Sequence, residues 1–134
     1  MDVLICSYSL LQQEIELLTA KEAKPWQMIV LDEAQAIKNA TTKRFQAAIA
    51  LKGHFKLALT GTPIENSLEE IWSLFRFITP GLLGSFDSFR KRFLSSSETG
   101  KDTRQALKSV VKTFILRCTK STVLQELPPR TEQT

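Results

Sequence analysis

Apolar residues follow two patterns along this chain: short continuous runs, and positions repeated at helical spacing. The continuous runs Val3–Tyr8, Met28–Leu31 and Phe55–Leu59 predict three strands. The run Met28–Leu31 does not alternate with polar residues, which is typical of a strand buried on both faces of a parallel sheet. Helical spacing follows each run, so residues 1–80 predict a β-α-β-α-β-α core with right-handed crossovers.

Polar residues mark where the helices of this core begin. Ser9 with Gln12, and Ser67 with Glu70, form capping-box pairs in which each side chain satisfies a free backbone N–H. The middle helix is predicted over residues 41–51. Gly53 and His54 then form a turn, and His54 is predicted to be a surface residue.

The pattern changes after residue 80, and residues 81–134 are predicted to be a basic helical extension. A short basic helix is predicted to carry Phe86, Phe89 and Phe93. After a polar loop over residues 95–101, Asp102 is predicted to cap a second helix. The apolar face of this second helix is expected to bury Leu107, Val110, Val111 and Phe114. Its other face carries Arg104, Lys108 and Lys112.

Composition indicates one globular domain of ordinary type. Residues 1–85 hold 8 Lys and Arg against 9 Asp and Glu, whereas residues 86–134 hold 10 against 5. This basic second half could face nucleic acid, although such a small excess is more often a solvated surface. No apolar run reaches the ~20 residues of a membrane span. Cys6 and Cys118 are far apart in sequence, and reduced thiols are expected.

Two carboxylates, Asp32 and Glu33, directly follow the predicted central strand. Ligands of open α/β sheets bind at the carboxyl ends of strands. An aspartate there can hold the magnesium of a nucleotide, and a neighbouring glutamate can polarise the attacking water, as in a Walker-B element. The same pair can equally cap the next helix, so the pair alone leaves both readings open.

Further motifs follow in a fixed order and extend this pattern. They are Asp32-Glu33-Ala34-Gln35, Ile37-Lys38-Asn39, Leu59-Thr60-Gly61-Thr62-Pro63, and Leu116-Arg117-Cys118-Thr119-Lys120. This series resembles the first motor lobe of SWI/SNF-type ATPases, the helicase-like translocases of superfamily 2 that move on double-stranded DNA. The resemblance implies a partial RecA-like (P-loop NTPase) lobe of about three parallel strands with flanking helices and a C-terminal helical segment.

The resemblance implies roles for the acidic motif. Asp32 would hold Mg²⁺ through water, and Glu33 would orient the lytic water in ATP hydrolysis. Gln35 stands where many relatives carry a histidine that couples the nucleotide site to the next motif. An amide can donate and accept hydrogen bonds like a neutral imidazole, but it cannot become charged.

The resemblance also implies coupling and contact roles outside the acidic motif. Thr60, Gly61 and Thr62 look like motif III, which links hydrolysis to movement between lobes, although they could also be a simple strand-end turn. Contacts to DNA or the second lobe are implied for Lys38, Asn39, Arg117 and Lys120. Lys38 and Asn39 could equally be a cation and a cap before the next helix. The stripe Arg104, Lys108 and Lys112 could touch phosphates, but a solvated helix face is favoured.

A Gly-rich phosphate-binding loop is absent from the sequence. The only Gly-Lys pair, Gly100-Lys101, precedes Asp102 instead of Ser or Thr and follows a polar loop. We therefore expect a piece of a longer ATPase whose partners are double-stranded DNA, the P-loop half and the second lobe. Alone it should be inactive and self-associating. The resemblance places it in the cytoplasm with the nucleoid in a bacterium, or in the nucleus of a eukaryote.

Two other functions remain open at this stage. The chain could be a stand-alone module that binds nucleic acid or protein on the same scaffold without catalysis. It could also derive from an RNA helicase of the same superfamily, although the Ile37-Lys38-Asn39 and Leu116–Lys120 segments argue against that reading.

Overall fold

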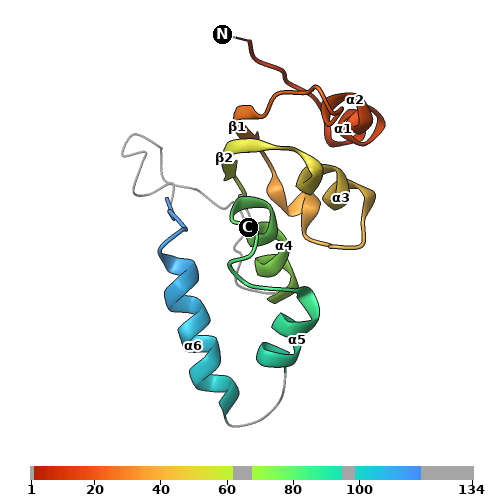
Figure 1. The fold of residues 1–134 in the computed structure, drawn as a ribbon. Coiled ribbons are helices and arrows are strands. Elements are labelled where there is room, and N and C mark those ends of the chain that lie inside the picture. Colours follow the sequence, from red (N-terminus) through yellow and green to blue (C-terminus); the bar gives the residue numbers. More distant parts are fainter. Residues whose placement is uncertain (1, 62–67, 95–98, 119–134) are drawn as a thin grey trace, which may run out of the picture. The chain divides into compact units, whose positions relative to one another are not determined.

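A computed structural model describes residues 2–61, 68–94 and 99–118 of the chain. The chain divides into two compact units, Met1–Leu94 and Ser95–Thr134. The first unit contains the sheet and most helices, and the second contains one long helix (Figure 1). Among the described residues no helix is long and apolar enough to span a bilayer.

The first unit is built on a two-stranded parallel sheet (Figure 1). Its strands are β1 (Trp26–Leu31) and β2 (Gly53–Ala58), with Met28 opposite Phe55 and Val30 opposite Leu57. Parallel strands need a crossover, which is supplied by the 3-10 turn η1 (Ala34–Ile37) and helix α3 (Lys43–Ala50). The predicted α/β class, with parallel strands and flanking helices, is confirmed.

The predicted strand over Val3–Tyr8 is wrong. Residues 2–7 form no regular structure, and the side chains of Val3 and Ile5 are 75% and 91% exposed. A strand needs a neighbour for its backbone N–H and C=O groups, but among the described residues β1 and β2 pair only with each other. The chain instead enters helix α1 (Tyr8–Gln13), followed by the short helix α2 (Ile15–Leu18).

The N-terminal cap of α1 differs from the predicted one. Ser7, not Ser9, is the N-cap, and its hydroxyl oxygen accepts a hydrogen bond from the Leu10 N–H. Gln12 does not return to a cap residue but donates from Nε2 to the Tyr8 carbonyl, 3.1 Å away. Ser9 lies two residues too late to be the cap, because the helix already includes Tyr8.

β2 begins earlier than predicted, so Gly53 and His54 are strand residues and not a turn. A Cβ on Gly53 would lie 2.7 Å from Cδ1 of Ile29. The glycine therefore allows close packing at the start of the strand rather than a reversal of the chain. His54 is exposed, as predicted.

Within the part of the chain that the structure describes, only one face of the sheet is covered, which corrects the prediction that β1 is buried on both faces. Ile29 and Leu31 are buried, on the face where helix α4 (Leu68–Ile78) packs against β2. The four apolar side chains of the opposite face are between 38% and 56% exposed; they are Met28, Val30, Phe55 and Leu57. The run of apolar residues correctly identifies a strand with apolar side chains on both faces. The described residues pack against only one of these faces.

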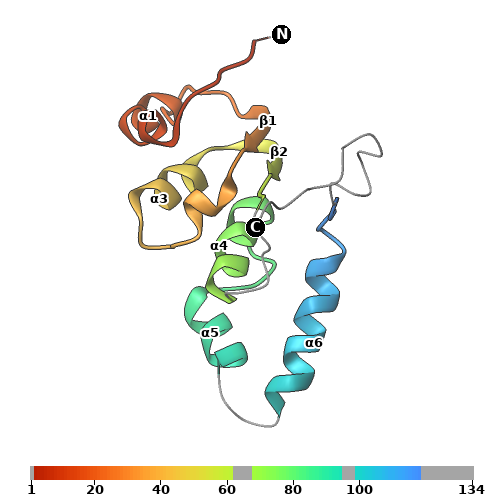
Figure 2. The same cartoon turned by 180° about the vertical axis from the view of Figure 1, so that it is seen from behind.

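Aromatic side chains form the core beside the sheet. Helix α4 (Leu68–Ile78) is followed by helix α5 (Phe86–Leu94) (Figure 2). Helix α4 buries Trp72, Phe75 and Phe77, and α5 buries Phe89 and Phe93. The Trp72 ring lies 6.0 Å from Phe45 of α3 and 5.0 Å from Phe86, and its Nε1 donates to the Gly84 carbonyl. One tryptophan therefore joins α3, α4 and the start of α5. The predicted Ser67 cap of α4 lies outside the described residues.

The second unit contains helix α6 (Thr99–Lys112). It begins three residues before Asp102, so that residue is not its cap and residues 99–101 are not loop. Gly100 lies inside this helix, where glycine costs ~1 kcal/mol relative to alanine. Leu107 and Val111 are buried as predicted. Val110 and Phe114, expected to be buried, are 43% and 50% exposed, since Val110 lies off the Leu107–Val111 stripe and Phe114 follows the helix end.

Candidate active site

Asp32 and Glu33 lie at the carboxyl end of β1, where the chain turns sharply into η1. Both side chains are exposed. Glu33 has φ 47° and ψ 51°, the left-handed region, and among the described residues it is the one non-glycine with positive φ. Its backbone N–H donates to Oδ1 of Asp32 at 2.9 Å. The turn therefore holds two carboxylates side by side at the edge of the sheet where ligands of α/β proteins bind.

Glu33 is connected to the end of the neighbouring strand through two hydrogen bonds. Gln35 donates from Nε2 to Oε2 of Glu33 at 2.6 Å. The Thr60 hydroxyl donates to Oε1 of Gln35 at 2.8 Å. Gln35 thus uses both ends of its amide, which fixes the amide orientation. We call the series Thr60, Gln35 and Glu33 the side-chain relay.

Backbone hydrogen bonds bring the members of the side-chain relay together. Leu59 N–H donates to the Leu31 carbonyl, and Ala34 N–H donates to the Leu59 carbonyl, both at 2.8 Å. The pairing of the two strands therefore continues beyond β2 and into the turn after β1. This places Thr60 next to Gln35, although 25 residues separate them in sequence.

Tyr8 is a member of the site that sequence reasoning missed. Its hydroxyl donates to the backbone carbonyl of Asp32 at 2.8 Å. Burial raises the pKa of Tyr8 above 10.0, and the nearby charges of Asp32 and Glu33 raise it further. The two residues are 24 positions apart, and the strand predicted over Val3–Tyr8 hid the contact. No local sequence signal could have found it.

Lys38 and Asn39 follow η1 and serve the structure around it. The Asn39 Oδ1 accepts from the N–H and the hydroxyl of Thr41, at 3.0 and 2.7 Å. The N-cap of α3 is Thr42, not Asn39. The Lys38 carbonyl accepts from the buried hydroxyl of Ser73 in α4 at 2.9 Å, while the Lys38 side chain is exposed.

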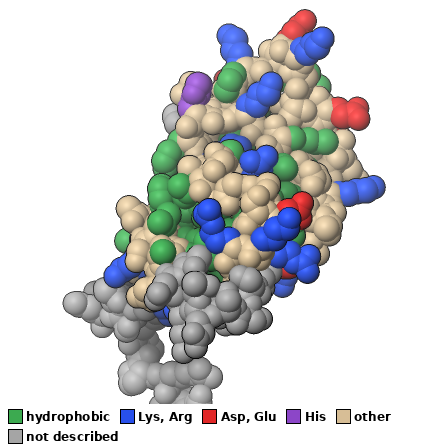
Figure 3. All heavy atoms as spheres, turned by 60° about the horizontal axis from the view of Figure 1, so that its bottom comes forward, with side chains coloured by type: hydrophobic (Ala, Val, Ile, Leu, Met, Phe, Trp, Pro, Cys, Tyr) green, Lys and Arg blue, Asp and Glu red, His purple; other side chains and the backbone are tan. Residues whose placement is uncertain are grey.

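For the other predicted contact residues, the structure gives the exposure of those that it describes. Gly61 is exposed, and Thr62 lies outside the described residues. In the second unit Lys108, Lys112 and Arg117 are exposed, whereas Lys120 and the side chain of Arg104 lie outside the described part. On the face drawn in Figure 3, Lys and Arg side chains are scattered among hydrophobic and other groups and form no continuous stripe.

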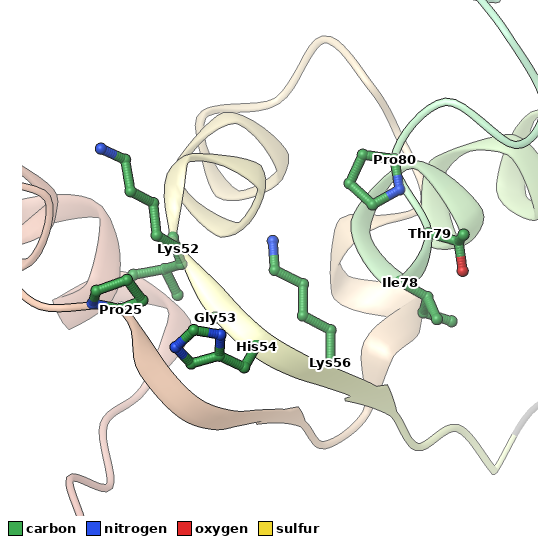
Figure 4. Close-up of a pocket in the computed structure, with 9 residues that line it drawn as sticks. Pro25, Lys52, Gly53, His54, Lys56, Ile78, Thr79 and Pro80 are labelled. Atoms are coloured by element: carbon green, nitrogen blue, oxygen red, sulfur yellow. The ribbon is translucent and has the colours of Figure 1, made fainter.

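A basic hollow of about 510 Å³ lies at the opposite end of β2. Lys52, His54 and Lys56 line it together with Pro80 beyond the end of α4 (Figure 4). Because the strands are parallel, their amino ends lie away from Asp32 and Thr60. The hollow is therefore separate from the candidate active site.

The turn formed by Asp32 and Glu33, which we call the acidic turn, suits magnesium held through water. Among the described residues no three His, Cys, Asp or Glu side chains form a group that could hold a metal alone. Asp32 uses Oδ1 for the Glu33 N–H, which leaves Oδ2 for an ion or its water. Magnesium keeps several waters and relies on one or two carboxylates plus substrate phosphates, so the residues present fit that ion.

Phosphates would need a cradle that this sequence does not supply in the described part. Gly100 and Lys101 lie in the first turn of α6, with no strand leading into them among the described residues. A phosphate-binding loop instead joins a strand to a helix. That the Gly-Lys pair is not such a loop stays a prediction from the sequence, in which Asp102 replaces the expected Ser or Thr.

Comparisons with known proteins agree with this geometry. A family model, the SNF2-related domain, matches residues 1–134. The chain is 41% identical over 136 residues to the putative ATP-dependent helicase/translocase YwqA of Bacillus subtilis, covering 98% of this chain and 14% of that protein. It is 38% identical over 138 residues to the chromatin-remodeling ATPase INO80 of Lodderomyces elongisporus, covering 97% and 9%.

A solved structure is similar in fold as well as in sequence. The Sulfolobus solfataricus SWI2/SNF2 ATPase core in complex with dsDNA superposes with a TM-score of 0.77 and 40% identity. The match covers 90% of this chain and 26% of that one. The resemblance and the RecA-like fold predicted from the sequence are confirmed, and the chain spans a small part of the relatives it matches.

Proposed function

The chain belongs to the SNF2-related domain family, and from this membership we propose that it is part of an ATP-dependent translocase on double-stranded DNA. Within that enzyme it would provide the Walker-B and motif III residues of the first lobe. The proposal rests on the side-chain relay, which joins the ends of both strands through bonds of 2.6 and 2.8 Å.

Asp32 and Glu33 would have separate roles at the nucleotide. Oδ2 of Asp32 would hold Mg²⁺ through water, and that ion would supply charge neutralisation at the phosphates of ATP. Glu33 would orient the attacking water with Oε1, because Gln35 occupies Oε2. The left-handed backbone of Glu33 sets the direction of this carboxylate.

Gln35 and Thr60 would carry the coupling between hydrolysis and movement. Movement of the segment after β2 would shift the Thr60 hydroxyl. The amide of Gln35 is hydrogen-bonded to both Thr60 and Glu33, so this shift would also move the Glu33 carboxylate. An amide has no proton to gain near neutral pH, so this coupling would not depend on a charge change at position 35. Gly61 and Thr62 would continue this motif beyond Thr60.

Double-stranded DNA is the proposed track. The similar Sulfolobus solfataricus core was solved in complex with dsDNA. Lys38 and Arg117 are exposed cations within the family motifs, and Lys120 belongs to the same motif as Arg117. These residues would contact DNA or the second lobe, while the Asn39 side chain stabilises its own loop. Lys108 and Lys112 are weaker candidates, because exposed lysines on a helix are commonly solvated.

The Glu33→Gln variant tests the proposal in the whole ATPase. It keeps the shape and most hydrogen bonds of the side chain but removes the carboxylate, so turnover should fall ~10²-fold or more while ATP binding survives. DNA-stimulated phosphate release and nucleotide affinity are the measurements. Glu16→Gln is the matched control, since Glu16 is an exposed carboxylate on α2. Near-normal turnover of Glu33→Gln would remove Glu33 from the mechanism.

A further inference from the structure

The Tyr8 hydroxyl contacts the acidic turn from a separate element. Tyr8 is the first residue of α1 and bonds the Asp32 carbonyl across 24 residues of sequence. α1 is itself held in place, because Ser7 caps it and Leu11 is buried beneath it. α1 also packs against α3. The Tyr8 side chain is therefore positioned by a helix that is itself packed against the rest of the unit.

The bond from Tyr8 completes a clamp on one peptide group. The carbonyl oxygen of the peptide between Asp32 and Glu33 accepts from Tyr8 at 2.8 Å. The N–H of the same peptide donates to Oδ1 of Asp32 at 2.9 Å. Rotation of this peptide would break both bonds and would redirect both carboxylates, because each side chain is attached to one end of it.

The peptide needs such a clamp because Glu33 has an unfavourable backbone conformation. Its φ of 47° lies in the left-handed region, which glycine and asparagine adopt far more readily than glutamate. Residues in such conformations persist only where their surroundings hold them, often at functional sites. Tyr8, which lies outside the turn, donates a hydrogen bond to this peptide.

The phenol is a suitable donor for this carbonyl. Its hydroxyl carries one O–H group, which donates a hydrogen bond to the Asp32 carbonyl at 2.8 Å.

We propose that Tyr8 is a positioning residue that clamps the Asp32–Glu33 peptide and so directs both carboxylates. This rests on the proposed function, in which Asp32 and Glu33 act on the nucleotide. Tyr8 does not itself reach the reacting atoms in this proposal. A purely structural role, in which Tyr8 only anchors α1 to the sheet, is the reading to be separated from it.

The test compares Tyr8→Phe with Thr19→Val. Tyr8→Phe removes only the hydroxyl and keeps the ring. Thr19→Val removes a hydroxyl that donates to a backbone carbonyl, Ile15, at 2.7 Å in the neighbouring helix α2 but away from the turn. In the whole ATPase kcat, KM for ATP and the Mg²⁺ concentration at half-maximal rate are measured. In the 134-residue chain the ¹³C shift of the Asp32 carbonyl reports the bond directly.

For Tyr8→Phe we expect kcat to fall by about 3- to 10-fold, the range that one lost hydrogen bond gives. KM for ATP should stay within about twofold, the Mg²⁺ requirement should rise, and the Asp32 carbonyl shift should change. Thr19→Val should alter none of these. An unchanged kcat in Tyr8→Phe, or an equal fall in Thr19→Val, would overturn the proposal.

The Glu33→Gln variant separates failure of this inference from failure of the proposed function. If Glu33→Gln abolishes turnover and Tyr8→Phe does not lower it, only the clamp is wrong. If Glu33→Gln turns over normally, the proposed function is wrong. The carbonyl shift in Tyr8→Phe then still shows whether the hydrogen bond exists.

Discussion

At the residue scale, Lys56 is a partly buried cation beside an aromatic ring. Its ammonium lies 4.8 Å from the centroid of the Phe77 ring, and Figure 4 shows it extending from β2 on the side of the helices. A cation over an aromatic ring is stabilised by the ring quadrupole. No acid lines the hollow beside it, however, and burial lowers the pKa of Lys56 below 10.5. The folded state thus disfavours this charge relative to the unfolded state.

Lys56→Met should change how stability depends on pH. Between the lowered pKa of Lys56 and 10.5, the unfolded chain binds more protons than the folded chain at this position, so stability rises with pH there. Below that window both states are protonated, and above it both are neutral. The unfolding free energy of the unaltered chain minus that of Lys56→Met should therefore rise across the window and be flat outside it.

Chemical denaturation at a series of pH values measures this difference. Lys52→Met is the matched control, because Lys52 lines the same hollow but is exposed. If the unfolding free energies of the unaltered chain and Lys56→Met follow parallel curves against pH, the expected destabilisation of the Lys56 charge by burial is wrong.

The residues of the acidic turn differ in how far the sequence could predict them. Asp32, Glu33 and Gln35 follow an apolar run, and Thr60 follows the next one, so strand order alone places them at one edge. Their roles in hydrolysis and coupling stay predictions. The Tyr8 contact could not be predicted, because it depends on where α1 begins. The left-handed Glu33 was equally hidden, since local preferences there favour glycine or asparagine.

At the element scale, the two strands present opposite faces of very different character. The face with Ile29 and Leu31 is buried, as the apolar run predicts. The other face carries four exposed apolar side chains, with Val30 directly opposite Leu57. Within the described residues β2 also pairs only with β1, so its outer edge has no ladder. Exposed apolar faces and open edges both favour association.

The 134-residue chain should therefore self-associate through this sheet face. Leu57→Lys places a charge in the centre of the face and should shift the chain toward monomer, as measured by light scattering over a range of concentrations. Ala50→Lys adds the same charge at an exposed position on α3 and should not. A chain that is monomeric at high concentration without any substitution would defeat this expectation.

The elements that the sequence identified correctly are those with local signals. β1 corresponds to a continuous apolar run, α3 and α4 have apolar residues at helical spacing, and all three appear near their predicted positions. The segment Val3–Tyr8 has strand-forming residues too, but a strand depends on a partner that the local sequence does not specify. The predicted cap of α1 is wrong for a similar reason. The helix begins two residues earlier than expected, so its N-cap is Ser7 and not Ser9.

At the scale of the whole molecule, the residues proposed for hydrolysis lie in a sequence that shows no Gly-rich phosphate loop. The acidic turn and the side-chain relay lie in the first unit. The sequence contains no Gly-rich phosphate loop, and its one Gly-Lys pair is helical. The chain also corresponds to 26% of the similar solved core. We therefore expect ATP hydrolysis to need a phosphate-binding loop in addition to the acidic turn.

The isolated chain should accordingly not hydrolyse ATP. Asp32 can reach a nucleotide only through magnesium, and magnesium depends on phosphates for its remaining ligands. Without a loop to fix those phosphates, the ion would be held by one or two carboxylates and water. An arginine from a second lobe contributes ~10³ to 10⁵ in rate in related phosphoryl transfer, and nothing in the acidic turn replaces it.

Calorimetry with ATP and magnesium should show no saturable binding, and phosphate release should not respond to added duplex DNA. The whole ATPase measured alongside is the positive control, since it would contain both missing parts. Glu33→Gln in the isolated chain distinguishes a trace contaminant from real activity, because only turnover by this chain depends on that carboxylate. Robust DNA-stimulated turnover that disappears in Glu33→Gln would mean that the acidic turn and the side-chain relay suffice, and that nucleotide binding has a basis other than a phosphate loop.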